Sequence, residues 1–195
     1  MKSLTKCNFY IMRHGQTTDN QAGIISGRSD PELTENGVQQ SLQVREILRN
    51  LELKPDKIIV SARKRTHMSA EILVDHTDFI IEPELNERDL GELDGKITED
   101  EQKAIGTLPG EESKDDHALR VINGINVHQE IGKTALFVVH AGTIRRVLES
   151  MGFKERVNVH NSQLYHFVPE KDGWRIYEYS LCDGQLRKLN ITPDW

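Results

Sequence analysis

The chain has 195 residues, of which 36% are hydrophobic and 29% are charged, a balance that predicts one globular domain over residues 1–195. Its formal net charge of −6 argues against a nucleic-acid partner, which would require a basic surface. The first residues lack the apolar core of a signal peptide and no run approaches the roughly 20 residues of a membrane span. We therefore expect a cytoplasmic protein without a membrane partner.

The first predicted element is a buried strand over residues 9–12, which stops at Arg13, His14 and Gly15. Neighbouring side chains of a strand point to opposite faces, so Arg13 and His14 can bind the same ligand only if the strand ends here. Gly15 permits that change of backbone direction. Ligands of open α/β sheets bind beyond the carboxyl ends of the strands. The donors that this stretch offers to a phosphate group are Arg13, His14, Thr17 and Asn20. The alternative is an ordinary basic strand end in solvent.

The remaining elements alternate between strand and helix patterns. Strands are predicted at 57–60, 79–81, 135–139, 164–168 and 174–181, and helices at 34–51, 68–73, 118–125 and 144–151, with Thr34 and Thr143 as N-caps. The turn at 171–173 indicates a hairpin. This pattern predicts an α/β three-layer sandwich whose mostly parallel central sheet is flanked by helices and has an antiparallel edge strand near the C-terminus. Residues 85–95 are expected to form a functional loop and residues 96–110 a mobile lid.

Four predicted strand ends carry reactive or charged groups, namely Arg13 with His14, Arg65, Glu87 and His140. A doubly wound sheet would bring these ends to one crevice. A neutral imidazole can attack phosphorus, guanidinium groups suit phosphate oxygens, and a carboxyl group can protonate the leaving alkoxide. The acid would be Glu87, whose burial is expected to bring its pKa closer to neutrality.

Motifs along most of the chain resemble the histidine phosphatase superfamily, in its branch of cofactor-dependent phosphoglycerate mutases and related phosphatases. The stretch from Arg13 to Asn20 is similar to the signature Arg-His-Gly-x-Thr-x-x-Asn. Further similar segments are Ser61 to Ala70, Leu85 to Gly95, Pro109 to Ser113 with Arg120 and Val121, and Val139 to Arg145. Five matches in the same order are far more specific than any single one.

The resemblance implies that His14 is the phosphorylated nucleophile and Glu87 the proton donor. It implies that Arg13, Arg65 and His140 contact the phosphoryl group. The further residues expected at the phosphate or substrate are Thr17, Asn20, Ser26, Gly27 and Ala141. The family uses no metal, and we expect no cofactor.

Several positions depart from the family pattern. Glu32 replaces a proline, Arg63 stands where a leucine is common and Thr66 where an alanine is common. These changes affect the expected substrate contacts and local packing rather than the proposed chemistry.

The sequence favours a phosphatase over a mutase, because the segment between Gly95 and Pro109 is short and offers only Lys96 and Lys103 to a phosphoglycerate carboxylate. Its acidic residues would also repel a substrate with several negative charges. We expect a small phosphorylated metabolite as substrate. The alternatives are a phosphoglycerate mutase, a phosphoprotein or phosphohistidine phosphatase, and a phosphate-binding module without turnover.

A metal site is not expected from the sequence. His160 and His166 lack a recognised ligand spacing, and Cys7 and Cys182 form neither a thiolate motif nor a disulfide framework. The oligomeric state, monomer or homodimer, stays open.

Overall fold

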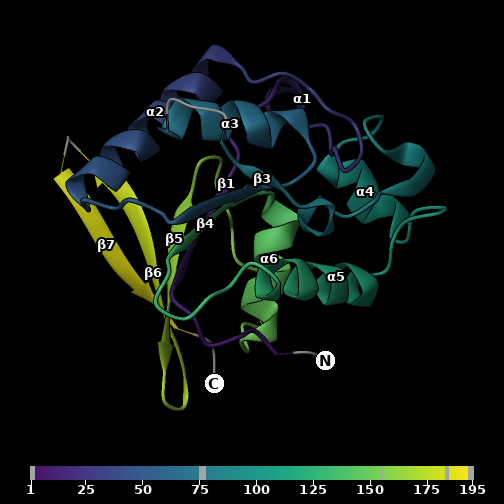
Figure 1. Cartoon of the computed structure of the whole chain (residues 1–195). Helices are drawn as coiled ribbons and strands as arrows, with labels where there is room; N and C mark the ends of the chain where they lie inside the picture. The colour runs from purple at the N-terminus through teal and green to yellow at the C-terminus, as the bar shows by residue number, and fades with distance from the viewer. Residues whose placement is uncertain (1–2, 75–77, 155, 183–184, 193–195) are drawn as a thin grey trace.

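The computed structural model describes residues 3–74, 78–154, 156–182 and 185–192. Its core is a seven-stranded sheet in the order β3-β2-β4-β1-β5-β6-β7 (Figure 1). The strands are β1 (Phe9–Arg13), β2 (Lys57–Val60), β3 (Ile80–Ile81), β4 (Ala135–Val139), β5 (Leu164–Glu170), β6 (Gly173–Cys182) and β7 (Gln185–Ile191). The first four in the order are parallel, whereas β5, β6 and β7 run antiparallel.

The predicted fold class is confirmed, and the antiparallel part is larger than expected. The hairpin around residues 171–173 joins β5 to β6, and β7 adds a further strand that the sequence pattern did not predict. The side chain of Cys182 lies outside the described part of the structure, and Cys7 is a buried free thiol.

Helices cover both faces of the sheet, as Figure 1 shows. One face carries α2 (Glu35–Asn50) and α3 (Lys64–Val74), and the other carries α5 (Lys114–Asn126) and α6 (Ala141–Ser150). The alternation of strand side chains explains the two layers: Phe9 and Ile11 point into one apolar cluster, and Tyr10 and Met12 into the other. Within the described residues, no helix has the length and apolar character needed to span a membrane.

Two short helices were not predicted as such. Both α1 (Thr18–Ala22) and α4 (Glu99–Ile105) begin with a capping box, formed by Thr17 with Asn20 and by Thr98 with Glu101. Each is too short for a periodic apolar pattern. Two single turns of 3-10 helix, η1 (Pro83–Leu85) and η2 (Gly91–Leu93), lie between β3 and α4. The expected lid segment thus contains a helix, and its mobility stays a prediction.

The expectation that Thr143 caps α6 is wrong. The N-cap is His140, in extended conformation, because β4 runs into α6 without an intervening loop. Thr143 lies buried in the first turn, where its hydroxyl reaches the carbonyl oxygens of Leu85 and Asn86 at 3.3 and 3.4 Å. It therefore ties α6 to the loop that carries Glu87.

The start of α2 packs directly on the backbone that follows β1. A Cβ at Gly37 would lie 2.1 Å from the carbonyl oxygen of Gln16, and one at Gly15 would lie 2.4 Å from the carbonyl oxygen of Gly37. Neither position can accept a larger side chain without moving residues 15–16. The closeness of α2 thus fixes the backbone next to His14.

We predict that Gly37→Ala destabilises the protein by about 1–3 kcal/mol, because the added methyl group clashes with backbone. In an unobstructed helix the same change would be stabilising by up to about 1 kcal/mol. The sign of the change in the free energy of unfolding therefore shows whether Gly37 is closely packed. The measurement is urea unfolding at equilibrium. The control is Gly173→Ala, where no atom lies within 4 Å of the added carbon. A Gly37 variant at least as stable as the wild type would contradict the close packing.

Candidate active site

The four parallel strands end at one edge of the sheet, and each is followed by a candidate residue. His14 follows β1, Arg65 follows β2, Glu87 follows β3 and His140 follows β4. The structure brings these side chains together, which their positions in sequence alone could not establish. His14, Arg65 and His140 are buried, with 4%, 1% and 0% of their surfaces exposed.

His14 is held in one orientation by its own loop. Its Nδ1 lies 2.7 Å from the carbonyl oxygen of Gly15. A carbonyl oxygen only accepts hydrogen bonds, so Nδ1 carries the proton and Nε2 keeps its lone pair. Burial, followed by the charges of Arg65 and Arg13, lowers the pKa of this ring well below 6.5. The imidazole is therefore neutral at pH 7.

His140 faces His14, with ring centroids 5.3 Å apart and planes inclined by 65°. Its Nε2 lies 2.7 Å from Oγ of Ser61, whereas its buried Nδ1 has no hydrogen-bond partner among the described residues. Burial, with the charge of Arg65, lowers the pKa of this ring well below 6.5. A hydroxyl donating to Nε2 would leave the proton on Nδ1, which would then be a free donor in the site.

The two arginines are fixed by backbone carbonyl groups. Arg13 donates from Nη1 to the carbonyl oxygen of Val159 at 2.8 Å, and its buried Nε has no partner among the described residues. Burial lowers the pKa of Arg13 to about 10, so it stays protonated at pH 7. Arg65 donates to the carbonyl oxygens of Ser26, Gly27 and Ser29. The guanidinium of Arg65 therefore also shapes the loop in which Ser26 and Gly27 lie.

Glu87 accepts hydrogen bonds from the N–H groups of Arg88 at 2.9 Å and of Gly142 at 2.8 Å. Gly142 belongs to the first turn of α6, so the carboxylate lies at the N-terminus of that helix. Burial opposes ionisation, but His117, the two N–H groups and Arg65 together outweigh it and lower the pKa of Glu87. The expectation that burial brings this pKa closer to neutrality is therefore wrong for the protein alone.

Of the other predicted residues, Thr17 and Asn20 bond to each other in the capping box of α1. Ser26 bonds to the carboxylate of Asp19, and the N–H of Gly27 donates to Asp94 at 2.9 Å. Within the described part of the chain, none of these residues forms a hydrogen bond with the His14 ring. Ala141 is the first residue of α6, next to His140.

A cavity of about 350 Å³ opens beside Glu87. Its lining consists of Arg28, Arg63, Pro83, Asn86, Glu87, Asp89, Glu112 and Arg120. Asn86 links two sides of this cavity, because the side-chain oxygen of Asn86 accepts a hydrogen bond from the N–H of Ala62 at 2.9 Å. The residues after β2 and those after β3 are thereby held together.

Arg120 supports the Glu87 loop from α5. It forms two short hydrogen bonds with Glu112, of 2.6 and 2.7 Å, and donates to the carbonyl oxygens of Glu84, Asn86 and Glu87. The motif of residues 109–113 with Arg120 was noted in the sequence, but this supporting contact could not be read from it.

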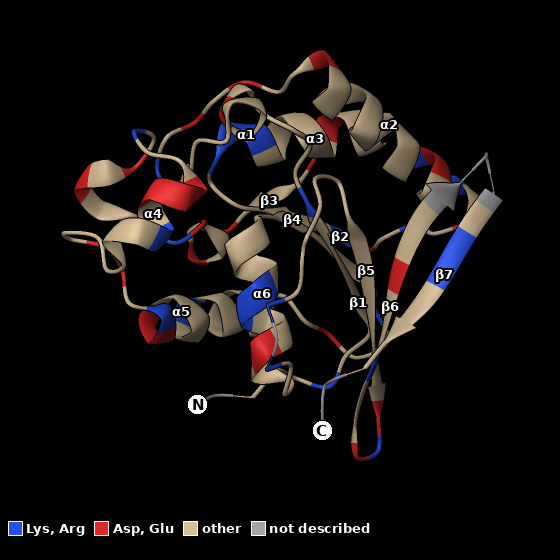
Figure 2. Cartoon of the chain, turned by 180° about the vertical axis from the view of Figure 1, so that it is seen from behind, with Lys and Arg blue, Asp and Glu red and all other residues tan. Residues whose placement is uncertain are grey.

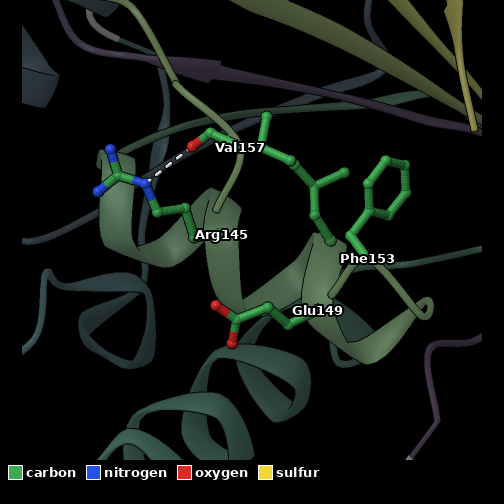
Figure 3. A pocket seen from close by; sticks show the side chains of 5 residues that line it. Arg145, Glu149, Phe153 and Val157 are labelled. Atoms are coloured by element: carbon green, nitrogen blue, oxygen red, sulfur yellow. Dashed lines mark hydrogen bonds between the residues drawn. The ribbon is translucent and has the colours of Figure 1, made fainter. Parts of the chain in front are cut away.

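A second depression lies between α6 and the segment after it, where Arg145, Glu149, Phe153 and Val157 meet (Figure 3). Its volume open to water is about 0 Å³, and Nε of Arg145 already donates to the carbonyl oxygen of Val157 at 3.1 Å. This depression cannot take a ligand in the present structure.

The model of the histidine phosphatase superfamily, branch 1, matches residues 9–181. The chain belongs to this superfamily. The resemblance drawn from the motifs is thereby confirmed.

Three relatives illustrate the range of this superfamily. The chain is 37% identical over 105 residues to the probable phosphoglycerate mutase GpmB of Erwinia tasmaniensis, a match that covers 53% of the chain and only 45% of that protein. It is 26% identical to the adenosylcobalamin/alpha-ribazole phosphatase of Salmonella typhimurium, over 95% of the chain and 97% of the relative. The structure of a mycobacterial glucosyl-3-phosphoglycerate phosphatase superposes with a TM-score of 0.71 at 22% identity, covering 87% of this chain and 96% of that one. This last likeness establishes the shared fold.

Two residues next to the catalytic groups of this protein were not predicted from the sequence. Asn161 donates to the carbonyl oxygen of His14 at 3.3 Å and to Oδ1 of Asn20 at 2.9 Å. His117 is 1% exposed, and its Nε2 has no hydrogen-bond partner among the described residues and lies 4.0 Å from Oε1 of Glu87. Burial lowers the pKa of His117 to about 4. His117 lies on the buried face of α5, and its position in the sequence does not distinguish it from the other buried residues of this helix.

We predict that the protein loses stability as the pH is lowered from 6.5 to 5. His14, His117 and His140 have pKa values below 6.5 in the folded state, and burial also lowers the pKa of His166 on β5 to about 4. The unfolded chain therefore binds more protons in this range. Each ring should contribute roughly 1 kcal/mol per pH unit to the loss. The measurement is the free energy of unfolding in urea at several pH values.

A matched variant isolates one of these rings. His117→Leu should reduce the histidine contribution to the slope of stability against pH by about a quarter, because one of four such rings is removed. A free energy of unfolding that is constant or rises on acidification of the wild type would contradict the assignment of neutral buried rings.

Proposed function

We propose that this chain is a metal-independent phosphomonoesterase that hydrolyses a small phosphorylated metabolite through a phosphohistidine intermediate on His14. The observation that carries the proposal is the hydrogen bond from Nδ1 of His14 to the Gly15 carbonyl oxygen. It leaves Nε2 as a neutral nucleophile, fixed in orientation and shielded from solvent.

In the first step, Nε2 of His14 attacks phosphorus and the bond from phosphorus to the ester oxygen breaks. The leaving alkoxide takes a proton from Glu87. In the second step, a water oxygen attacks phosphorus while Glu87 takes up a proton from that water. The phosphorus–nitrogen bond breaks, which releases inorganic phosphate and restores neutral His14. Nε of Arg13 and Nδ1 of His140, both buried without partners among the described residues, are the donors that we assign to the phosphoryl oxygens.

The low pKa of Glu87 is compatible with its role as an acid, because the substrate itself changes the electrostatics. A phosphate dianion next to the carboxylate adds like charge, which raises the pKa and favours protonation. Two buried guanidinium groups compensate the charge of the dianion, as a metal ion would in a metal-dependent phosphatase.

The alternative of a phosphoglycerate mutase has less support. The two lysines available in the 96–110 segment are engaged elsewhere: Lys96 donates to the carbonyl oxygen of Glu92, and Lys103 pairs with Asp100. A phosphoprotein phosphatase is also disfavoured, since His14 is only 4% exposed and a small ester reaches it more readily than a protein side chain.

The first test is phosphate release from p-nitrophenyl phosphate in excess chelator. We expect turnover by the wild type and a loss of at least about a thousandfold in His14→Ala, since the nucleophile is absent. His128→Ala is the matched control, because this ring pairs with Glu82 and not with any residue of the site. Equal turnover by the wild type and His14→Ala would contradict the phosphohistidine mechanism.

The second test concerns the role of Glu87. Glu87→Gln should lower kcat for an alkyl phosphate by about 10²- to 10⁴-fold, because a poor leaving group needs the proton. The loss should be much smaller for p-nitrophenyl phosphate, whose leaving group departs as an anion. Glu84→Gln serves as the control on the exposed part of the same segment. An equal loss for both esters would show that Glu87 is not the acid.

A further inference from the structure

One cation in the cavity beside Glu87 lacks a counterion. Among the described residues, the guanidinium group of Arg63 has neither an ion pair nor a hydrogen bond, and its Nε is buried. Burying part of a charged group without a partner is unfavourable, so this arrangement lowers the stability of the folded protein. This cost suggests a ligand that supplies the missing partner.

The two other basic residues of the cavity wall, Arg28 and Arg120, each have an acidic partner in the wall. Arg28 contacts Asp89 at 3.2 Å and donates to the carbonyl oxygen of Gly91. Arg120 is occupied by Glu112 and by three carbonyl oxygens. With respect to the residues that the structure describes, these pairs leave Arg63 as the wall cation that is free to bind an anion.

The backbone of Arg63 is fixed to the catalytic region. Its N–H donates to Oγ of Ser61 at 3.2 Å, and the same oxygen lies 2.7 Å from Nε2 of His140. The neighbouring N–H, of Ala62, donates to Asn86, which precedes Glu87. Arg63 is also close enough to His140 for its charge to act on that ring. Arg63 and Glu87 line the same cavity, so a substrate that takes its proton from Glu87 and extends into this cavity would pass Arg63.

We propose that Arg63 binds a second anionic group of the substrate, so that the protein prefers phosphomonoesters that also carry a carboxylate or a second phosphate. The proposal rests on the phosphatase function and narrows its substrate class.

Three acidic residues of the 96–110 segment have partners of their own and lie outside the lining of the cavity. The ribbon of α4 carries both acidic and basic residues (Figure 2). Glu99 pairs with Arg156, Asp100 pairs with Lys103, and Glu101 accepts from its N-cap residue Thr98. None of these residues lines the cavity. Repulsion of multiply charged substrates by this segment stays a prediction from the sequence.

The test compares three esters of the same carbon chain: propyl phosphate, 3-(phosphonooxy)propanoate and propane-1,3-diyl bisphosphate. The wild type should prefer at least one of the two doubly anionic esters in kcat/KM by about 10- to 100-fold, the effect of one hydrogen bond to a charged group. Whichever ester is preferred identifies the second anion as a carboxylate or a phosphate. Arg63→Leu should reduce the preference ratio to about one.

Two further variants separate the contact from general charge and from folding. Lys64→Leu removes a neighbouring exposed cation outside the cavity and should keep the wild-type ratio. Arg63→Lys keeps the charge without the planar fork and should retain part of the preference. The proposal is overturned if the wild type shows no preference, or if Arg63→Leu keeps it.

If the protein is not a phosphatase, the outcome differs from a loss of the preference ratio. In that case none of the three esters is hydrolysed by any variant. Binding of 4-phosphonobutanoate and butylphosphonate, measured by calorimetry, then still decides the role of Arg63. Tighter binding of the carboxylated phosphonate to the wild type but not to Arg63→Leu supports the contact, and equal binding of both compounds to the wild type refutes it.

Discussion

The burial of several basic groups at one edge of the sheet is the constraint on which the rest of the site depends. Arg13 and Arg65 remain charged there, whereas His14 and His140 are neutral because burial and the guanidinium charges disfavour their protonation. One cause thus produces both an anion-binding field and an uncharged nucleophile. In solvent, the same two histidines would be partly protonated near neutrality and His14 would be a poorer nucleophile.

Backbone groups, rather than carboxylates, hold this positive cluster in place. The carbonyl oxygens of Val159, Ser26, Gly27 and Ser29 fix the two arginines without neutralising them. Arg65 also forms a long ion pair with Asp30, at 3.6 Å. A closer ion pair would stabilise the fold but would compete with a phosphoryl group for the same guanidinium, so the choice of carbonyl partners preserves the capacity to bind anions.

The Glu87 loop shows how distant segments act on one carboxylate. Arg120 of α5 holds its carbonyl groups, Thr143 of α6 reaches the two residues before it, and Gly142 donates to the carboxylate itself. A side chain at Gly142 would collide with the carboxylate, at 2.1 Å from Oε1. The position of Glu87 is therefore decided by two helices that follow it in the sequence and pack against the same face of the sheet.

The sequence by itself determined the strands that are long and apolar, the helices with a periodic buried face, and the reactive residues at the strand ends, because these signals are local. His14 and His140 could be singled out since each follows an apolar run directly. Strand β7, the short helices α1 and α4, and the N-cap of α6 escaped prediction, since their patterns are too short or compete with a better-known cap residue. Only the tertiary structure decided which tautomer His14 adopts, that His117 lies against Glu87 and that Arg63 has no counterion in the described part of the chain. Each of these depends on the distance between groups from separate elements, and the free energy of a buried charge or proton is set by those neighbours, which the local sequence does not specify.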